Sequence, residues 1–500
     1  MRAIERAAIA TGAVTGRTLM ERAGRGVVDA LLTQWPAMRD GPRRAAVLCG
    51  PGNNGGDGFV VARLLRDRGW RVDLHSWGRA ADLPPDARAN ADLWMETGAL
   101  RDWPEGGDWA DGADLVVDAV LGTGLVRPVP AAMHAPLRAA SERGLPLVAV
   151  DGLTGLDLDT GAMRIMGGSP ARADLTVTFH AAKVGHYLAD GPARSGRLVV
   201  TDIGLDPVPG ADDAPSCRLV DLSAGDAARC LRKTDGHKYD HGHVLVLSGG
   251  VGRGGAARMA ARGALRIGAG LVTLACPPAA LIENAAQLDA IMLRAVKDEG
   301  ALTDLLGDPR LDTLCLGPGL GLTAREAGLL RAALRVGRGT VLDGDALTLL
   351  ARDDDLFSLL HECCVLTPHA GEFARLFPDL ADRLAKDSAF SKLDAARQAA
   401  LRAGCTVLVK GPDTVIAGPD GQAALAPASY GRAVPWLATA GAGDVLSGFI
   451  AGLLARGFDP MRAAETGAWL HVECARQLGA GMIAQDLPDA LPRVFARLGL

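Results

Sequence analysis

The chain has 500 residues, which is too long for one ordinary hydrophobic core and predicts more than one domain. With 48% hydrophobic and 22% charged residues it can bury a large interior and need not be disordered. The formal net charge of -5 is small and no basic stripe is present, so we do not expect a nucleic-acid partner.

The N-terminal segment, the apolar stretches and the cysteines indicate the expected cellular location. The N-terminal segment MRAIERAAIATGAVTG lacks the apolar core of a signal peptide, and no apolar stretch approaches the ~20 residues of a membrane span. The nine Cys show no metal-ligand spacing, and Cys363-Cys364 lies in an apolar run, which is typical of buried thiols in a reducing compartment. We expect a soluble cytoplasmic protein with no membrane partner.

Residues 1–215 alternate between strand-like and helix-like segments, with a Gly-rich loop at 51–58. This alternation predicts a parallel sheet covered by helices on both faces, as in a Rossmann-like three-layer α/β domain. The expected helices span 18–35 and 59–70, and the expected strands and strand–loop units span 45–50, 71–77, 114–124 and 145–155.

The segment 206–217, DPVPGADDAPSC, has no periodicity and is rich in Pro, Asp, Ala and Gly, so we expect a linker there. A second α/β alternation runs from 225 to 500. No sequence repeat relates the two halves, which predicts two unrelated domains. The second set of expected strands begins at 243, 270, 312, 339, 364 and 405, and an apolar helix follows near 442.

The first candidate site is the segment 49–59, CGPGNNGGDGF, between an expected strand and an expected helix. Glycines there let backbone amides approach an anion, although simple turn geometry explains them equally well, and the spacing differs from G-x-G-x-x-G. Asp118 and Asp151 end two further expected strands. Because ligands gather at the carboxyl ends of parallel strands, we expect Asn54, Asp118 and Asp151 to converge. Their oxygen atoms suit a hard cation rather than zinc.

These motifs, with TVTFHAAKVGH at 176–186 and GRLVVTDIG at 196–204, resemble the N-terminal epimerase domain of the NAD(P)H-hydrate repair enzymes over nearly all of 1–215. The resemblance implies that this domain binds the hydrated dinucleotides NADHX and NADPHX and a potassium ion, and that Asp151 is catalytic at the reacting ring. The implied dinucleotide-binding residues are Asn53, Asn54, Gly55, Gly56, Asp57, Gly122, Thr123, Gly124, Leu125, Val126, Arg127, Pro128 and Asp151, and the implied potassium ligands are Asn54, Asp118 and Thr154.

One loop departs from this family. The family usually reads Asp-Ile-Pro-Ser-Gly where this chain has Asp151-Gly152-Leu153-Thr154-Gly155. The Thr154 hydroxyl can replace that of Ser as a potassium ligand. The missing Pro predicts a less rigid loop and a reduced epimerase activity.

The second candidate site is TAGAGDVLSGFIAGLLARG at 439–457, where small residues and Asp444 precede an apolar helix. Amides at such a helix start bind anions, and Asp444 could accept a proton from a substrate hydroxyl, or act only as a helix cap. Upstream, Lys410 and Thr414 follow an expected strand and could lie near a nucleotide. Asp343 and Asp345 end another strand, where they could form a magnesium shell or cap the next helix.

This arrangement resembles the ribokinase-like superfamily, and within it the ADP-dependent NAD(P)H-hydrate dehydratases over about 230–500. The resemblance rests on HKYDHGHVLVLSGGVGRGGAARMAARGALRIGAGLVTLACP at 237–277 and on CLGPGLG, VLDGDALTLL and VLTPHAGEFARL. It implies a ribokinase-like fold, ADP as co-substrate, magnesium, and Asp444 as the catalytic base. The implied NAD(P)HX-binding residues are Ala256, Gly319, His369 and Asp444, and the implied ADP-binding residues are Lys410, Gly411, Pro412, Asp413, Thr414, Thr439, Ala440, Gly441, Ala442 and Gly443.

Two positions differ from the usual pattern of these dehydratases. Ala370 stands where Pro is more common, and Arg253 where Met is common, but neither position carries a catalytic charge. His369 by itself would be read as a polar turn residue, and only its place in TPHAGE indicates a ligand contact.

Together the two halves predict an enzyme that interconverts the R and S epimers of NAD(P)HX and dehydrates the S epimer with ADP, releasing AMP and phosphate. We expect a homo-oligomer. Two alternatives remain: a ribokinase-like kinase of a vitamin precursor, such as a hydroxyethylthiazole kinase, and a non-enzymatic scaffold role for 1–215, as in RNA-decay complexes.

Overall fold

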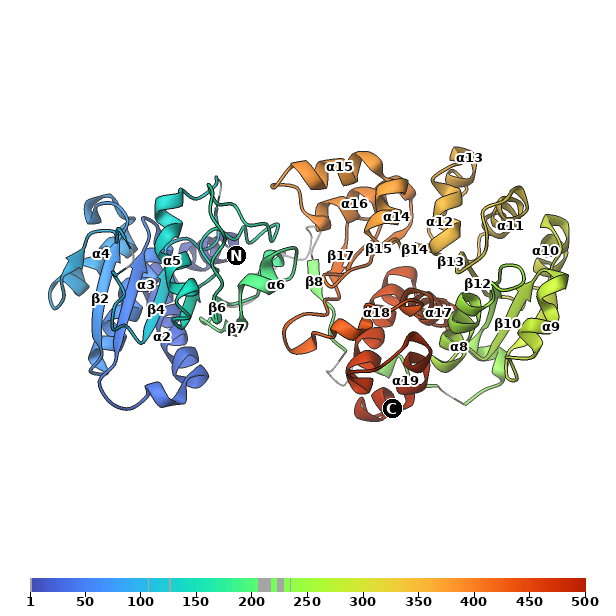
Figure 1. The fold of residues 1–500 in the computed structure, drawn as a ribbon, viewed down its shortest axis with the longest axis horizontal. Helices are drawn as coiled ribbons and strands as arrows, with labels where there is room; N and C mark the ends of the chain where they lie inside the picture. The colour runs from blue at the N-terminus through green and yellow to red at the C-terminus, as the bar shows by residue number, and fades with distance from the viewer. Residues whose placement is uncertain (1, 107, 126, 206–216, 223–228, 234) are drawn as a thin grey trace. The chain divides into compact units, whose positions relative to one another are not determined.

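The computed structural model describes the chain except for residues 1, 107, 126, 206–216, 223–228 and 234. It divides into two compact units, Met1–Ala214 and Pro215–Leu500 (Figure 1). The expected linker at 206–217 lies outside the described residues except for Cys217, and so does Val126 of the expected dinucleotide site.

The first unit contains a parallel sheet with the strand order β3-β2-β1-β4-β5-β6-β7. The order reverses between β1 and β4, and in sheets of this kind a ligand crevice forms there at the carboxyl ends of the strands. The strands are β1 (Arg44–Cys49), β2 (Arg71–Ser76), β3 (Leu100–Arg101), β4 (Leu115–Ala119), β5 (Leu147–Val150), β6 (Leu175–Phe179) and β7 (Arg197–Thr201).

Helices cover both faces of this sheet. On one face Val47 of β1 shares a core with Val27 and Phe59, and on the other face Leu48 shares a core with Leu137. Successive side chains of a strand point to opposite faces, which explains the two cores. The helices are α1 (Arg2–Ala10), α2 (Gly16–Gln34), α3 (Asn53–Asp67), α4 (Pro85–Met95), α5 (Ala131–Glu142) and α6 (Gly191–Arg194), with 3₁₀ turns η1 (Pro36–Met38), η2 (Ala80–Asp82) and η3 (Val184–His186).

The expected loop at 51–58 is wrong in part, because α3 already begins at Asn53. The Asn-Asn-Gly-Gly-Asp motif therefore forms the first turns of this helix. Gly55 packs so closely on the preceding strand end that a Cβ there would lie 2.1 Å from the carbonyl oxygen of Gly50. The glycines thus bring a helix N-terminus against the end of β1.

The second unit contains a sheet with the order β11-β10-β9-β12-β13-β14-β15-β16-β17-β8, in which β16 is antiparallel to both of its neighbours. Its first strand, β8, pairs with β17, so the unit begins before residue 225, the boundary expected from the sequence. The strands are β8 (Cys217–Leu219), β9 (His243–Leu247), β10 (Leu271–Cys276), β11 (Met292–Ala295), β12 (Thr313–Leu316), β13 (Gly339–Leu342), β14 (Cys364–Leu366), β15 (Thr406–Val409), β16 (Val415–Ala417) and β17 (Ala423–Leu425).

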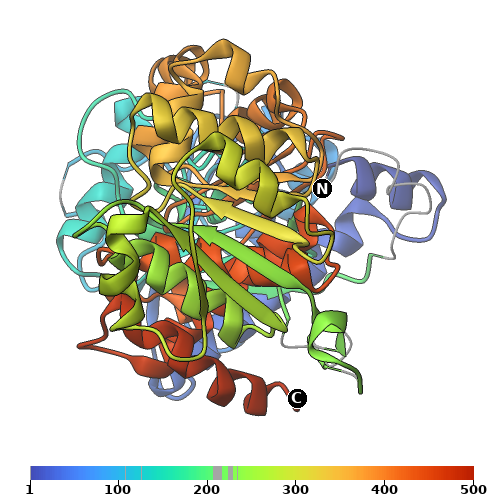
Figure 2. The same ribbon diagram turned by 90° about the vertical axis from the view of Figure 1, so that its right-hand side faces the viewer.

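Figure 2 shows this sheet between two groups of helices, drawn in green and red on one side and in yellow and orange on the other. On the first side Val246 of β9 shares a core with Ala260 and Phe449. The helices are α8 (Gly255–Arg266), α9 (Leu281–Ala285), α10 (Glu299–Leu306), α11 (Ala324–Arg335), α12 (Gly344–Leu350), α13 (Asp354–Phe357), α14 (Ala370–Leu376), α15 (Pro378–Lys386), α16 (Lys392–Ala403), α17 (Ala442–Ala455), α18 (Pro460–Leu478) and α19 (Leu487–Arg497), with 3₁₀ turns η5 (Lys238–His241), η6 (Pro278–Ala280), η7 (Tyr430–Arg432), η8 (Pro435–Leu437) and η9 (Ala484–Asp486).

The α/β architecture expected for both halves is confirmed, with a predominantly parallel sheet in each unit. In the described part of the chain, no helix has both the length and the apolar character needed to cross a membrane.

A fragment that ends at Ala214 should fold alone, because every strand of the first sheet and both of its cores precede that residue. We expect one cooperative urea transition by circular dichroism, with a coincident change in Trp fluorescence, since Trp94 is fully buried. A gradual, probe-dependent loss of signal would contradict the independence of this unit.

Candidate active sites

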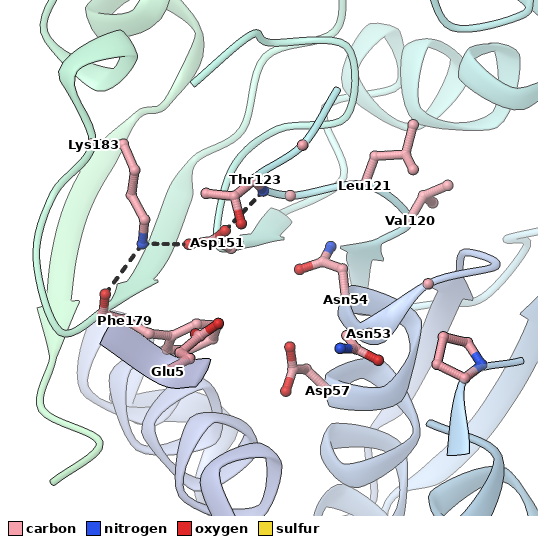
Figure 3. Close-up of a pocket in the computed structure, with 14 residues that line it drawn as sticks. Glu5, Asn53, Asn54, Asp57, Val120, Leu121, Thr123, Asp151, Phe179 and Lys183 are labelled. Carbon is pink, nitrogen blue, oxygen red and sulfur yellow. Dashed lines mark hydrogen bonds and ion pairs between the residues drawn. The ribbon is translucent and has the colours of Figure 1, made fainter. Parts of the chain in front are cut away.

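A cavity of about 370 Å³ opens at the carboxyl ends of β1, β4, β5 and β6 (Figure 3). It lies beside the reversal of strand order, where the topology places a ligand crevice. The structure brings together seven of the residues expected there, namely Asn53, Asn54, Asp57, Gly122, Thr123, Gly124 and Asp151.

Asp151 follows β5 and is held by an ion pair. The Lys183 ammonium donates to Asp151 Oδ1 at 2.7 Å, and the backbone N–H of Thr123 donates to Oδ2 at 3.0 Å. Burial opposes ionisation of this carboxyl, but Lys183 and the hydrogen bonds outweigh it, so the pKa of Asp151 lies below its usual value. The residue also has φ = 64°, a conformation uncommon for a residue with a side chain. Asp151 is therefore a fixed carboxylate at the cavity wall.

Asp57 reaches the same cavity from α3. Burial, together with the nearby carboxylates of Asp151 and Glu5, raises the pKa of Asp57 well above its usual value, although Lys183 lowers it. The cavity thus contains two aspartic acids whose pKa values are shifted in opposite directions.

Asp118 does not line the cavity but lies fully buried beside it. Its two carboxylate oxygens accept hydrogen bonds of 2.7 Å from the hydroxyl and the backbone N–H of Thr154. Burial raises the pKa of Asp118 to about 6 against these hydrogen bonds. Within the described ranges no Lys, Arg or His side chain forms an ion pair with it.

These residues fit a potassium ion. The side-chain nitrogen of Asn54 is buried without a hydrogen-bond partner in the described part of the chain, and the oxygen and nitrogen of such an amide are interchangeable in assignment. Asn54, Asp118 and Thr154 together offer amide, carboxylate and hydroxyl oxygens, which are hard ligands. A cation there would also compensate the unpaired charge of Asp118.

The loop after Asp151 is held without the Pro usual in the family. Leu153 is fully buried in the core beneath α5, and the N–H of Leu156 donates to its carbonyl. The backbone N–H of Thr154 is tied to Asp118. Burial and hydrogen bonds therefore fix the loop that the sequence predicts to be loose.

Several expected residues lie elsewhere, and seven of the lining residues were not among those expected. Gly55 and Gly56 pack against neighbouring elements rather than lining the cavity, and Leu125, Arg127 and Pro128 are not among its lining residues. Lys183 and Phe179 lie in the segment 176–186 that carries the resemblance, and Gly52, Val120 and Leu121 adjoin expected residues, whereas nothing in the sequence indicated Glu5 or Pro84. The unexpected lining residues are Glu5, Gly52, Pro84, Val120, Leu121, Phe179 and Lys183.

The second site lies at the start of α17. Its N-cap, Gly441, has φ = 89°, a backbone conformation that favours glycine. Asp444 lies in the first turn, beside the free amides of the helix N-terminus. Burial, reinforced by Asp343 and Glu372 and opposed by Lys410, raises the pKa of Asp444 to about 6.

Lys410 lies directly beneath this helix start. Its ammonium donates to Asp343 Oδ1 at 2.7 Å and lies 3.8 Å from Glu372, and a Cβ on Gly443 would lie 3.2 Å from its Nζ. Asp343 Oδ2 accepts a hydrogen bond of 2.7 Å from Ser447. The cation is thus positioned by a buried carboxylate under the amides that would bind phosphate.

A second cavity, of about 430 Å³, adjoins Lys410 and the start of α17. Its wall is mostly apolar, which suits a nucleotide base. Of the residues expected to bind ADP, Asp413, Thr439, Ala440 and Gly441 do not line it, and Asp413 pairs with Lys392 at 2.6 Å. The expected lining residues are Lys410, Gly411, Pro412, Thr414, Ala442 and Gly443, and the unexpected ones are Ala426, Ala428, Ala433, Val434, Pro435, Leu437, Ala438, Leu446, Ala468, His471 and Val472.

The residues expected to contact the hydrated nicotinamide nucleotide fall in two places. A Cβ on Gly319 would lie 3.6 Å from Ala256 Cβ, so these two positions meet. His369 caps α14, and its Nδ1 accepts from the N–H of Gly371 at 3.0 Å. Its side chain is 55% exposed, so the capping role leaves a face open to a ligand.

Asp343 and Asp345 both accept hydrogen bonds from within the protein. Asp343 caps α12 and pairs with Lys410, and Asp345 accepts the N–H of Gly321 at 2.8 Å. Across the described residues, no group of three or more His, Cys, Asp and Glu is arranged to hold a metal ion. Of the two alternatives left open by the sequence, the structure shows the capping role for Asp343, whereas Asp345 bonds the N–H of Gly321 and caps no helix in the described part of the chain.

Lys410→Met should lower the free energy of unfolding by about 3–5 kcal/mol, because it leaves the Asp343 carboxylate buried without its cation. Urea denaturation measures this change. Lys386→Met removes an ammonium from an ion pair whose Lys side chain is 73% exposed and should cost less than about 1 kcal/mol. Equal losses for the two variants would show that the Lys410 pair is not the stabilising one.

Comparisons with known proteins cover both units. A family described as NAD(P)H-hydrate dehydratase matches residues 244–495, and a family described as YjeF-related protein N-terminus matches residues 16–185. The Bacillus subtilis structure described as an ADP/ATP-dependent NAD(P)H-hydrate dehydratase co-crystallized with ATP/Mg²⁺ is 27% identical, with a TM-score of 0.46, and the match covers 56% of this chain and 99% of that one.

Curated relatives match over nearly the whole length. The bifunctional NAD(P)H-hydrate repair enzyme Nnr of Moorella thermoacetica is 37% identical over 96% of this chain and 92% of its own, and that of Escherichia coli is 34% identical over 96% and 90%. The NAD(P)H-hydrate epimerase of Rhodobacter capsulatus is 48% identical over 41% of this chain and 96% of its own. The chain therefore belongs to the family of bifunctional NAD(P)H-hydrate repair enzymes.

Proposed function

We propose that this chain repairs hydrated NADH and NADPH with two activities in one polypeptide. The first unit interconverts the R and S epimers, and the second dehydrates the S epimer with ADP, giving NAD(P)H, AMP and phosphate. The observation that supports this best is the presence of two separate sites in a single chain, a cavity lined by Asp57 and Asp151 in the first unit and the start of α17 with Asp444 in the second.

The dehydration follows from the geometry at α17. Asp444 takes the proton of the ring hydroxyl as the hydroxyl oxygen attacks the terminal phosphorus of ADP. The amides of Ala442 to Asp444 and the Lys410 ammonium stabilise the charge on the phosphoryl group in transfer. The ring nitrogen's electron pair then expels phosphate, and loss of a proton from the adjacent carbon restores the dihydropyridine.

The nucleotide occupies the apolar cavity beside Lys410, with its phosphates at the start of α17. Since no carboxylate shell is available among the described residues, we propose that magnesium enters with the ADP phosphates rather than on protein ligands. In the first unit, potassium held by Asn54, Asp118 and Thr154 would supply a fixed positive charge beside the hydrated nicotinamide.

A requirement for one epimer explains why the two activities share a chain. Asp444 and the phosphate-binding amides are fixed on one helix, so the ring hydroxyl must point in one direction to react. An epimerase makes the other epimer usable. The cytoplasmic location and the homo-oligomeric state remain predictions. Light scattering of the purified protein tests the oligomeric state.

The two alternatives make different products. A vitamin-precursor kinase would release a stable phosphorylated product, whereas the dehydratase releases AMP and free phosphate. A scaffold role for the first unit predicts no turnover of the epimers. The paired Asp151 and Lys183 in its cavity favour catalysis. Incubation with mixed epimers, with and without ADP, separates these functions.

Asp444→Asn should abolish dehydration, because the amide cannot accept the proton, while epimerisation in the other unit continues. For the wild type, kcat/KM for dehydration should fall as the pH drops below about 6, since Asp444 is then protonated. Chromatographic separation of the epimers and NADPH measures both reactions. An Asp444→Asn variant with more than a few per cent of the wild-type dehydration rate, or a wild-type rate unchanged between pH 7 and 5, would rule out Asp444 as the base.

Thr154→Ala should raise the potassium concentration needed for half-maximal epimerisation about tenfold, because it removes one oxygen ligand. Thr154→Ser should leave it within about twofold. The rate is followed against KCl at constant ionic strength, with choline chloride as the replacement salt. Equal potassium dependence in all three proteins would exclude Thr154 as a ligand.

A further inference from the structure

The cavity of the first unit contains a second carboxyl group that the proposed chemistry has not yet used. Asp57 and Asp151 reach this cavity from different walls, Asp57 from the first turns of α3 and Asp151 from the end of β5 (Figure 3). In Figure 3 the open space of the cavity lies between them.

The two carboxyl groups differ in their partners. Asp151 has Lys183 on Oδ1, with Thr178 donating to the same oxygen at 2.9 Å and Thr123 donating to the other oxygen. Among the described residues, no cationic side chain forms an ion pair with Asp57, and its charged neighbours include the acidic Asp151 and Glu5. Lys183 therefore forms an ion pair with the carboxylate of Asp151 and not with that of Asp57.

This difference in partners suits acid–base catalysis. A pair of carboxyl groups kept in opposite protonation states can donate a proton on one side of a substrate and accept a proton on the other side. Burial raises the pKa of Asp57 well above its usual value, and Lys183 holds that of Asp151 below its usual value in spite of burial.

We infer that Asp57 and Asp151 are an acid–base pair acting on opposite faces of the hydrated nicotinamide ring, and that Lys183 assigns the carboxylate role to Asp151. The inference rests on the epimerase function proposed above and specifies how that reaction occurs.

The chemistry balances without another reagent. Asp57 protonates the ring hydroxyl on its own face, and the bond between carbon and oxygen breaks to release water. The lone pair of the ring nitrogen forms a double bond to that carbon, and the cation is favoured by the surrounding carboxylates. A water molecule on the other face attacks the carbon and gives its proton to Asp151. The product is the opposite epimer, and the proton has moved from Asp57 to Asp151, ready for the reverse reaction or for exchange with solvent.

This route replaces the hydroxyl oxygen with one from solvent. The alternative, in which the bond between the ring nitrogen and the carbon opens to an aldehyde and closes again on the other face, keeps the original oxygen. To distinguish the two routes, the full-length wild type is incubated with a single epimer of hydrated NADPH in H₂¹⁸O, without ADP. The new epimer is separated at early times and its mass is measured by mass spectrometry.

We expect one ¹⁸O in each molecule of new epimer. Retention of ¹⁶O, with epimerisation intact, would overturn the acid–base pair and leave the epimerase function standing. Failure of the wild type to epimerise at any potassium concentration would overturn both.

Asp57→Asn should slow epimerisation at least about 100-fold, because the amide cannot deliver the proton. Asp67→Asn, at the exposed end of the same helix, is the matched control and should keep the wild-type rate. The fragment that ends at Ala214, carrying Asp57→Asn, should keep the circular dichroism spectrum and the urea transition of the unsubstituted fragment, which shows that the first unit is folded. An Asp57→Asn variant with near-wild-type epimerisation would refute the inference.

Lys183→Met tests the positioning role. The titratable groups around Asp151 are Lys183, His186, Asp57 and Glu5, and removal of the only ammonium among them should move the acidic limb of the epimerisation rate to higher pH. Lys183→Arg should restore most of the wild-type profile. A slower rate with an unmoved pH profile would mean that Lys183 only supports the fold.

Discussion

Two buried ion pairs between a lysine and an aspartate, one in each unit, govern the chemistry of both sites. A carboxylate removed from water is costly unless a cation and hydrogen bonds compensate it. In the first unit Lys183 compensates Asp151, and in the second Lys410 compensates Asp343. The neighbouring acids, Asp57 and Asp444, have no such partner among the described residues, and both have raised pKa values.

The pairs are used in opposite ways. In the first unit the paired aspartate itself faces the cavity, so the lysine keeps a reactive group charged. In the second unit the paired Asp343 caps α12 and holds Lys410 under the helix start, while Asp444, unpaired among the described residues, lies in the first turn of α17. The same interaction therefore sets the charge of the proposed catalytic carboxylate in one site and the position of the proposed phosphate-binding cation in the other.

The sequence predicted what depends on local pattern. The sequence was sufficient to predict the alternation of strands and helices, the Gly-rich helix starts and the acidic residues at strand ends. Each of these features is determined by a few consecutive residues. The ion pairs were not, because Lys183 lies 32 positions from Asp151 and Lys410 lies 67 from Asp343. The apolar wall of the nucleotide cavity was missed for a similar reason, as the segment from Ala426 to Ala438 has no periodicity. The start of α3 was misplaced because Gly55 lowers helix propensity, and only its contact with Gly50 shows why it is there.

The short strand β8 has a consequence for how the second unit can be handled. The chain enters this unit as the edge strand beside β17, eight residues before the boundary that the sequence suggests, and Cys217 to Leu219 satisfy the backbone groups along that edge. An expression fragment begun at residue 225 would therefore expose the unpaired side of β17, and such an open edge recruits strands from other molecules. Aggregation of that fragment would reflect a missing neighbour rather than an unstable fold.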